Sequence, residues 1–298
     1  MARSLFLAWP YCIIKRQVMR SAEILGDKFI QRWDVRAEQQ EDGSYLCIRE
    51  PLMPSDLKEH VLGDKTLGAY ILNEKGHARY TVFDADNEVE YHKMFIVADR
   101  LFAEGVPSYM ESSRRGGHLW FFTQVPISGE AAKRFGEGVT EEHGLAVEVF
   151  PKTVTDNVGS LIRLPFGIHR KSGRRYPFVN IEDGLPIAPT VGKQLTMLRN
   201  AEKVPLEHIR RYMEIVPVKV TENEPERGSD DVYAYVSQFV ELKPTRSGGV
   251  GHCPFHHDEH MSFSVNRRGN YWNCFAGCGG GRVEQFRAKW DLIEGGQK

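Results

Sequence analysis

The chain of 298 residues has little net charge, no long apolar run and no internal repeat. Its 39 basic and 40 acidic residues give a net charge of −1, which excludes a wholly basic nucleic-acid-binding chain but not a local basic patch. No apolar run approaches the roughly 20 residues that span a bilayer. Its hydrophobic content of 41% and charged content of 27% are typical of a soluble globular protein.

The apolar residues 5–14 resemble the core of a secretory signal. Pro10 interrupts them, Lys15 and Arg16 follow directly, and no small-x-small cleavage site comes after them. We therefore expect a cytoplasmic protein without membrane association.

Cysteine is scarce, with five residues, and its placement is uneven. Cys12 and Cys47 stand alone, whereas Cys253, Cys274 and Cys278 cluster near the C-terminus among histidines. This usage indicates a metal site in a reducing compartment rather than a disulfide framework.

The order of apolar patterns predicts an α+β fold with one sheet and helices packed on one of its faces. Residues 68–72 and 79–83 predict two strands joined by a glycine-containing hairpin. Apolar periodicity and turn residues then predict a helix at 90–104, strands at 108–112 and 119–123, a helix at 129–143 and a strand at 146–150.

The strand predicted at 79–86 ends in two carboxylates, Asp84 and Asp86. Side chains two apart on a strand share a face, so the two carboxylates should project together. They repel each other unless a cation lies between them, and Mg²⁺ or Mn²⁺ is the usual cation because both prefer carboxylate oxygen. The alternative is a solvated strand end with two unrelated acids.

Three further groups of polar residues have both a functional and a structural interpretation. Residues 113–118 place Arg114, Arg115 and two glycines before His118. This segment either binds phosphate oxygens or is a surface hairpin with solvated arginines. Glu148, in an otherwise apolar strand, is a third metal ligand or lies on the solvent face, and Lys152 meets a phosphate or is exposed.

The third group is a basic turn that runs from residue 163 to residue 175 without an acid. This local bias fits contact with a triphosphate or a nucleic-acid backbone, and a solvated loop is the alternative. Its charged or titratable residues are Arg163, His169, Arg170, Lys171, Arg174 and Arg175.

Two short ligand pairs near the C-terminus are spaced like those of a zinc ribbon. They are Cys253-Pro-Phe-His256 and Cys274-Phe-Ala-Gly-Cys278, with strands predicted at 262–265 and 271–272 between them. A module this small needs a bound metal for stability because its hydrophobic core is too small to stabilise the fold alone. His256 is the expected fourth ligand, with three other histidines as alternatives: His252, His257 and His260.

Five motifs in order resemble the archaeo-eukaryotic primase superfamily, and specifically the primase-polymerases of TOTE conflict systems. They are Leu67-Gly-Ala-Tyr, Phe83-Asp-Ala-Asp, Gly-Gly-His118-Leu-Trp, Glu148-Val-Phe-Pro-Lys and Ile162-Arg-Leu-Pro-Phe-Gly-Ile-His-Arg. The resemblance implies an RRM-like α+β catalytic core over residues 1–217, of which residues 1–60 match only loosely.

The resemblance also implies roles for these residues. Asp84, Asp86 and Glu148 would hold two catalytic Mg²⁺ or Mn²⁺ ions. The expected nucleotide-binding residues are His118, Arg163, Arg114, Arg115, Lys152, His169 and Arg170.

The C-terminal pattern resembles the zinc-binding (CHC2) domain of bacterial replicative primases, which contacts template DNA. It implies a module at 231–298 that binds one structural Zn²⁺ through Cys253, His256, Cys274 and Cys278, after a linker at 218–230. The second pair is one residue longer than is usual in that family. The expected template-binding residues, chosen for charge and stacking, are Arg267, Arg268, Tyr271 and Trp272.

Together the two resemblances predict an enzyme, a DNA-templated primase-polymerase that makes primers on single-stranded DNA from NTPs or dNTPs and extends them. Its implied partners are the template and a helicase or other replication or conflict-system proteins. An end-joining or gap-filling repair polymerase, or a non-catalytic replication-initiator subunit, are the alternatives.

Overall fold

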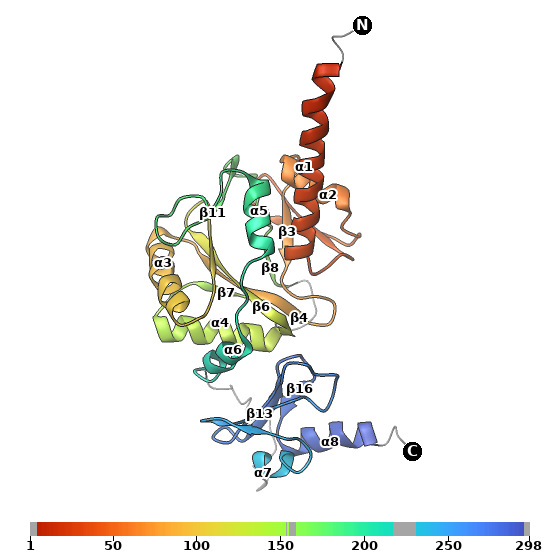
Figure 1. The fold of residues 1–298 in the computed structure, drawn as a ribbon, viewed down its shortest axis with the longest axis vertical. Coiled ribbons are helices and arrows are strands. Elements are labelled where there is room, and N and C mark those ends of the chain that lie inside the picture. Colours follow the sequence, from red (N-terminus) through yellow and green to blue (C-terminus); the bar gives the residue numbers. More distant parts are fainter. Residues whose placement is uncertain (1–4, 153, 155–158, 217–230, 295–298) are drawn as a thin grey trace.

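The computed structural model describes residues 5–152, 154, 159–216 and 231–294. A larger N-terminal part contains two large antiparallel sheets and a small two-stranded one, and a smaller C-terminal module contains a further sheet (Figure 1). The predicted α+β fold class is confirmed. The linker predicted at 218–230 lies outside the described residues. None of the described helices is both long and apolar enough to cross a membrane.

A central five-stranded sheet has the strand order β11-β5-β6-β4-β7. Its strands are β4 (His77–Ala85), β5 (Tyr109–Ser112), β6 (Gly117–Ser128), β7 (Glu148–Phe150) and β11 (Phe178–Val179). The helices α3 (Glu88–Ala103) and α4 (Gly129–His143) cover one face of it. On that face Phe121 packs edge-on against Phe135 of α4, and Gly117 leaves room for the ring of Tyr91 from α3.

The opposite face of the central sheet packs against the end of α1 (Leu5–Phe29). The Phe29 ring contacts the rings of Tyr80, Trp120 and Phe122 at centroid distances of 6.4, 5.2 and 5.9 Å. All four side chains are almost completely buried. This aromatic contact fixes the helix against the face on which Asp84 also lies, because residues 80, 82 and 84 alternate onto one side.

A second sheet of four strands, in the order β2-β1-β3-β8, stands beside that same face. Its strands are β1 (Arg36–Gln39), β2 (Tyr45–Ile48), β3 (Leu67–Tyr70) and β8 (Leu161–Arg163). The other elements of the N-terminal part are α2 (Pro54–Leu62), α5 (Val191–Arg199), α6 (Leu206–Met213), β9 (Ile168–His169) and β10 (Arg174–Arg175).

The two-sheet arrangement corrects two predictions. The strands at 67–70 and 77–85 do not form a hairpin, because β3 pairs with β1 and β8 whereas β4 pairs with β6 and β7. The N-terminal part also has more than the one sheet that was predicted. The buried Ile71 and Leu72 carry the chain from one sheet to the other, so these strands adjoin in sequence without pairing.

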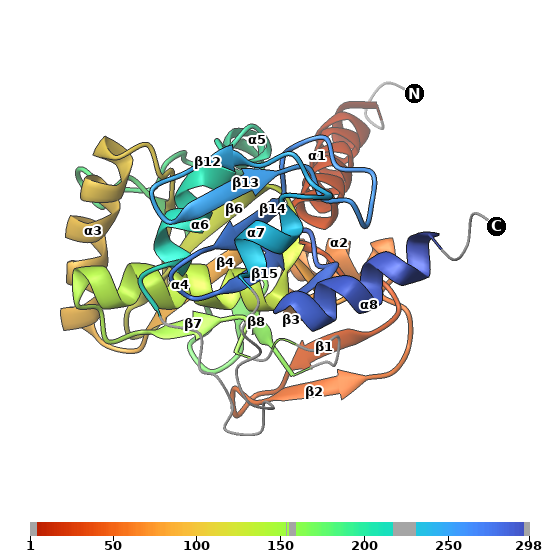
Figure 2. The same ribbon diagram turned by 90° about the horizontal axis from the view of Figure 1, so that it is seen from below.

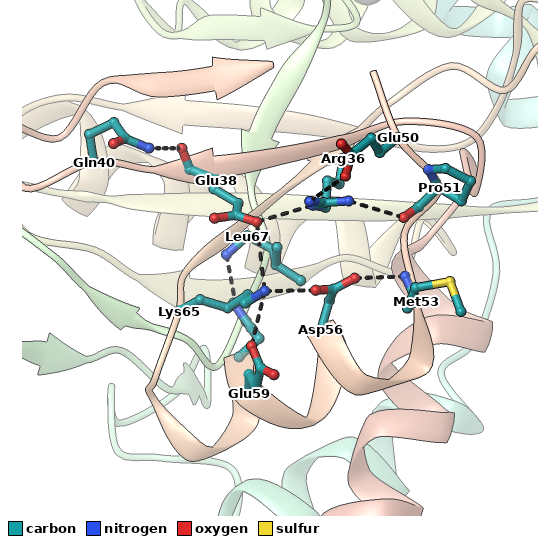
Figure 3. Close-up of polar contacts among 11 residues, drawn as sticks. Arg36, Glu38, Gln40, Glu50, Pro51, Met53, Asp56, Glu59, Lys65 and Leu67 are labelled. Atoms are coloured by element: carbon teal, nitrogen blue, oxygen red, sulfur yellow. Dashed lines mark hydrogen bonds and ion pairs between the residues drawn. The ribbon is translucent and has the colours of Figure 1, made fainter. Parts of the chain in front are cut away.

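A network of charges joins α2 to the second sheet (Figure 3). Lys65 lies 2.7 Å from a carboxylate oxygen of Asp56 and 2.9 Å from one of Glu59, and Arg36 bridges Glu38 and Glu50. Such partly exposed pairs each contribute at most about 1 kcal/mol, so their main effect is to orient the helix.

The buried His60 of α2 fixes the segment that leads into the basic turn. Its Nδ1 accepts a hydrogen bond from the Leu67 amide at 3.0 Å, and its Nε2 lies 2.9 Å from the Pro165 carbonyl oxygen. Burial lowers the pKa of His60 to about 3, so the ring is neutral and Nε2–H is the donor. Gly167 is required beside it, since a Cβ there would lie 2.2 Å from the ring.

The C-terminal module is a five-stranded sheet, with one helix before its first strand and one after its last strand in the chain. Its elements are α7 (Val232–Val236), β12 (Lys243–Pro244), β13 (Gly248–Gly251), β14 (Phe263–Asn266), β15 (Tyr271–Cys274), β16 (Gly279–Gly281) and α8 (Val283–Glu294). Its core contains Phe263, Trp272 and Phe286, all at most 1% exposed.

The module docks on the α4–α6 side of the N-terminal part (Figures 1 and 2). Phe275, which lies between two of the zinc-ligand cysteines, is 3% exposed and belongs to the apolar core of the N-terminal part. Its carbonyl oxygen accepts a hydrogen bond from the Ser128 amide at 2.9 Å. The neighbouring Ala276 carbonyl meets His77 Nε2, and Ser247 donates to Glu214 at 2.6 Å. The loop between Cys274 and Cys278 therefore takes part in the contact between the two parts.

Candidate active site and zinc centre

Four titratable residues form one row across the central sheet. Asp84 on β4 is directly opposite Glu148 on β7 and His118 on β6, and His118 is directly opposite Glu111 on β5. Directly opposed residues in antiparallel strands point to the same face. The register therefore places Glu111, His118, Asp84 and Glu148 side by side on the face turned away from α3 and α4.

Glu111 is the fully buried end of this row. Its Oε2 accepts hydrogen bonds from His118 Nδ1 at 2.7 Å and from Trp120 Nε1 at 3.0 Å. Its Oε1 accepts one from Arg163 of β8 at 2.7 Å. Burial opposes ionisation of Glu111, but the charge of Arg163 and the hydrogen bonds from His118 and Trp120 hold its pKa below the usual range. Glu111 is therefore an anion.

His118 is oriented by Glu111 towards Asp84. Because Nδ1 donates to Glu111, the second nitrogen, Nε2, lies 3.6 Å from Asp84 Oδ1. The ring is only 4% exposed, so this orientation is fixed by packing as well as by hydrogen bonding. Nε2 is the atom of His118 that is available to a substrate.

The three carboxylates of the predicted metal site differ in burial. Burial, with Asp86 and Glu148 nearby, raises the pKa of Asp84 above its usual range, although His118 and Arg163 act against this. Asp86 and Glu148 are more than half exposed, and their partners are Arg115 and Lys152 respectively. Three hard oxygen donors around one strand end match the ligand preference of Mg²⁺ and Mn²⁺, and Arg115 and Lys152 are the groups that such ions would displace.

A cavity of about 200 Å³ opens over this row. Three residues that line it each have a buried polar atom without a hydrogen-bond partner among the described residues: Tyr45 Oη, Arg163 NH1 and His169 Nδ1. Buried polar atoms are rarely left unpaired, so each such atom in a native structure calls for an explanation. A cavity lined by these residues beside carboxylates fits a phosphorylated ligand with bound cations.

Some of the predicted site residues line this cavity and others do not. The cavity is lined by Asp84, Asp86, Arg114, Arg115, His118, Arg163 and His169. Lys152, Arg170 and Glu148 do not line it, although Glu148 is directly opposite Asp84. The Arg170 amide instead donates to the Gln39 side chain.

The glycines before His118 have a structural purpose. A Cβ at Gly116 would lie 2.1 Å from the Ala85 carbonyl oxygen, and one at Gly117 would lie 2.1 Å from the Tyr91 ring. Small residues therefore let β6 approach the end of β4 closely enough to bring His118 beside Asp84.

Two residues of the site were not found from the sequence. Glu111 had the same signal as Glu148, an acid inside an otherwise apolar strand, and it reaches the site from β5. Tyr45 lies on β2 in the N-terminal 60 residues, where the sequence shows no motif, and only the folded cavity, which it lines together with Arg163, reveals it.

The C-terminal module brings four metal-ligating side chains together. Ligand atoms of Cys253, His256, Cys274 and Cys278 all lie within 4.8 Å of one another, the only such cluster that the described residues form. His252, His257 and His260 are not part of it. One cysteine–histidine pair and one cysteine–cysteine pair in this arrangement would hold one tetrahedral Zn²⁺.

Asp258, which was not predicted from the sequence, fixes the first ligand pair. Its carboxylate, 3% exposed, accepts hydrogen bonds from the Cys253 amide at 2.6 Å and from the Ser262 amide and hydroxyl at 2.8 and 2.9 Å. Burial opposes ionisation, but these hydrogen bonds lower the pKa of Asp258. The carboxylate thereby closes the loop that carries Cys253 and His256.

The four residues predicted to bind template differ in how far their side chains are exposed to solvent. Trp272 is 1% exposed and stacks on Phe263 inside the module, so the prediction that its ring stacks on a base is wrong. Tyr271 is half-buried, Arg268 is exposed, and the Arg267 guanidinium lies 3.7 Å from the centre of the Tyr233 ring.

Two family matches agree with this division of the chain. Residues 27–212 match the family described as TOTE conflict system, Archaeo-Eukaryotic Primase domain. This chain belongs to that archaeo-eukaryotic primase family. Residues 225–294 match the CHC2 zinc finger. Both predicted resemblances are confirmed, while the individual residue roles stay predictions.

Individual relatives of this primase-family chain are more distant. It is 43% identical over 61 residues to a DNA primase of Clostridium acetobutylicum, a match that covers 20% of this chain and only 10% of that primase. The catalytic domain of primase RepB′, solved with initiator DNA, is 12% identical and covers 65% of this chain and 98% of its own, with a TM-score of 0.37. The primase-polymerase of cyanophage S-2L is 13% identical and covers 56% of this chain and 89% of its own, with a TM-score of 0.33.

Opposite effects on stability are expected from two carboxylate substitutions in the primase-family site. The pKa of Asp84 is raised in the folded state, so its ionised form destabilises the fold as pH rises through that pKa, and Asp84→Asn should raise Tm at pH 7 without divalent metal. The pKa of Glu111 is lowered, so its contribution is present at pH 7 and lost as pH falls through the folded-state value.

Glu111→Gln should therefore destabilise the protein by about 3–5 kcal/mol, because it leaves Arg163 buried without its partner. Thermal unfolding of both variants at pH 7 measures this contrast. Destabilisation by both substitutions to a similar extent would refute the assignment of one strained and one stabilised carboxylate.

Zinc removal should unfold the C-terminal module selectively. A chelator should make residues 231–294 sensitive to limited proteolysis while the sheet that carries Asp84 stays protected, since binding energy for structural zinc is folding energy. Metal analysis should give one zinc per chain in the wild type and in a Cys47→Ser control, and less in Cys274→Ser. A module that stays protease-resistant in chelator would contradict the zinc assignment.

Proposed function

We propose that this chain is a primase-polymerase that makes primers de novo on single-stranded DNA and extends them. The observation that carries the proposal is the row of Glu111, His118, Asp84 and Glu148, in which His118 and Asp84 line a cavity together with Arg163 of the second sheet. Membership of the archaeo-eukaryotic primase family supports it.

Asp84, Asp86 and Glu148 would hold the catalytic ions. When bound, two Mg²⁺ or Mn²⁺ ions lower the pKa of the attacking 3′-hydroxyl and neutralise the triphosphate. The carboxylates are suited to this because Asp84 is fixed within the strand, whereas the exposed Asp86 and Glu148 have room to adjust.

The cavity residues would bind the nucleotide. The Arg163 guanidinium would donate to a phosphate oxygen, and His118 Nε2 would contact another from the side of Asp84. Arg114 and Arg115 lie at the opening, where their charge suits the pyrophosphate end. The 3′-hydroxyl oxygen attacks the α-phosphorus, its proton is lost, and the bond from that phosphorus to the pyrophosphate oxygen breaks.

The pairing of Arg163 with Glu111 is part of this function. The Glu111 carboxylate accepts a hydrogen bond from Arg163 NH2, whereas Arg163 NH1 has no hydrogen-bond partner among the described residues. A buried arginine with one anionic partner inside the protein is held in a single orientation, which prepares it for a second anion.

Loss of synthesis with retained folding is expected when either strand-end aspartate is replaced. Asp84→Ala and Asp86→Ala should each reduce primer-free synthesis on single-stranded DNA to background, because each removes an oxygen ligand for the ions. The matched control is Asp99→Ala, an exposed acid on α3, which should retain wild-type synthesis.

The assay supplies template with labelled NTPs or dNTPs and no primer. Retained synthesis in Asp84→Ala, with circular dichroism unchanged, would refute the assignment. A wild-type protein that extends a supplied primer but makes nothing without one would instead be a gap-filling or end-joining polymerase. A wild type inactive in both assays would be a non-catalytic initiator subunit.

A further inference from the structure

A second cavity, of about 380 Å³, lies between the C-terminal module and the α4–α6 side of the N-terminal part. We call it the interdomain pocket. Arg134 of α4 and Arg210 of α6 form one wall, and the strand residues Asn273 and Tyr271 of β15 form the other. It is on the opposite side of the central sheet from Asp84, since α4 and Asp84 lie on different faces.

Unpaired hydrogen-bond donors are concentrated in this pocket. Nine buried side-chain nitrogen or oxygen atoms in the described residues have no hydrogen-bond partner there. Three belong to side chains that line the candidate active site. Four belong to side chains that line the interdomain pocket: Arg134 Nε, Arg210 Nε, Arg210 NH2 and Asn273 Nδ2. All four are donors, whereas the pocket presents no unpaired buried acceptor in the same set of residues.

The side chains that line the pocket also carry an excess of positive charge. Four arginines line it, Arg134, Arg210, Arg211 and Arg246, against the two acids Glu207 and Glu214. Glu214 already accepts a hydrogen bond from Ser247, and Arg211 is paired with Glu104 and Glu142 outside the pocket. Arg134 and Arg210 are held by their surroundings: Arg134 is 7% exposed and donates through NH2 to the Met213 carbonyl, and the Arg210 guanidinium lies 5.2 Å from the Phe275 ring centre.

Arg134 is buried and Arg210 is partly buried, and both have donors without a hydrogen-bond partner among the described residues. Such guanidinium groups favour an anion that accepts several hydrogen bonds, and phosphate is the biological group that does so best. The volume is that of a small-ligand site. The pocket also offers aromatic surface, since the Tyr271 ring centre lies 5.9 Å from the Arg134 guanidinium carbon. Donors to phosphate beside an aromatic ring are the elements that recognise a nucleotide.

We propose that the interdomain pocket is a second nucleotide site, which binds a nucleotide phosphate through Arg134, Arg210 and Asn273. The phosphate belongs either to a free nucleotide or to a nucleotide within a DNA strand. Because the site is built jointly by α4, α6 and β15, its occupation links the two parts of the chain. This proposal does not depend on the catalytic function, since it concerns binding on the other side of the sheet.

Binding of thymidine 5′-monophosphate to the full zinc-loaded chain, without added Mg²⁺ or Mn²⁺, tests the proposal by calorimetry. Arg210→Ala should weaken binding at least fivefold, and Asn273→Ala should weaken it to a smaller extent. Arg100→Ala is the matched control: it removes one exposed arginine from α3, far from the pocket, and should bind like the wild type. Thymidine, which lacks the phosphate, should not bind measurably.

Arg246→Ala provides a variant at an exposed position of the pocket mouth, which should fold normally and weaken binding about twofold to fivefold. Unlabelled dT10 without terminal phosphates separates the two sources of phosphate. Displacement of the monophosphate by dT10 would assign the pocket to a strand, and no displacement would assign it to a free nucleotide. Equal affinity in the wild type, Arg210→Ala and Arg246→Ala, or equal binding of thymidine and its monophosphate, would overturn the proposal.

Discussion

The buried carboxylate of Glu111 is the interaction on which the candidate active site depends. A carboxylate without water must receive hydrogen bonds from every side, and Glu111 receives them from β6 through His118 and Trp120, and from β8 through Arg163. It therefore ties the central sheet to the second sheet at the point where the cavity forms. The same three bonds set which nitrogen of His118 and which nitrogen of Arg163 face a ligand. Asp84, directly beside His118, then adds the first carboxylate of the metal site.

The C-terminal module uses its metal ligands for a second purpose. The loop between Cys274 and Cys278, one residue longer than in the primase zinc domains that it resembles, carries Phe275 into the apolar core of the N-terminal part. A zinc ion in the cluster would hold both ends of that loop, so metal binding and domain contact are expected to be coupled. The interdomain pocket lies next to this contact, with Phe275 and Arg210 on its border. An anion there would offset the positive charge that docking brings together.

Local sequence patterns predicted the features that local chemistry determines. The two aspartates at a strand end, the glycine pair before His118 and the spaced cysteine pairs are each visible within a few residues, because strand alternation and ligand spacing are short-range rules. The α+β class followed from the order of helices and strands. The family match then confirmed the type of protein that these motifs had suggested.

Features that depend on contacts between distant segments could not be predicted. The strands at 67–70 and 77–85 look like a hairpin, but long-range pairing with β8 and β6 places them in different sheets. Trp272 looks like a stacking residue, but a small module needs it for its core. Glu111 and the interdomain pocket are defined by partners from segments 50 residues or more away, such as Arg163 for Glu111.

Nucleotide affinity of a Glu111→Gln variant is the most direct measurement of the central claim. Calorimetric titration with dTTP and Mn²⁺, below the unfolding temperature of each variant, compares it with the wild type and with Glu182→Gln, an exposed control. We predict a loss of at least about tenfold in Glu111→Gln, equal to about 1.4 kcal/mol, and no loss in the control. Affinity equal to that of the wild type in folded Glu111→Gln would contradict the account, because Arg163 and His118 would then bind the nucleotide without the carboxylate that orients them.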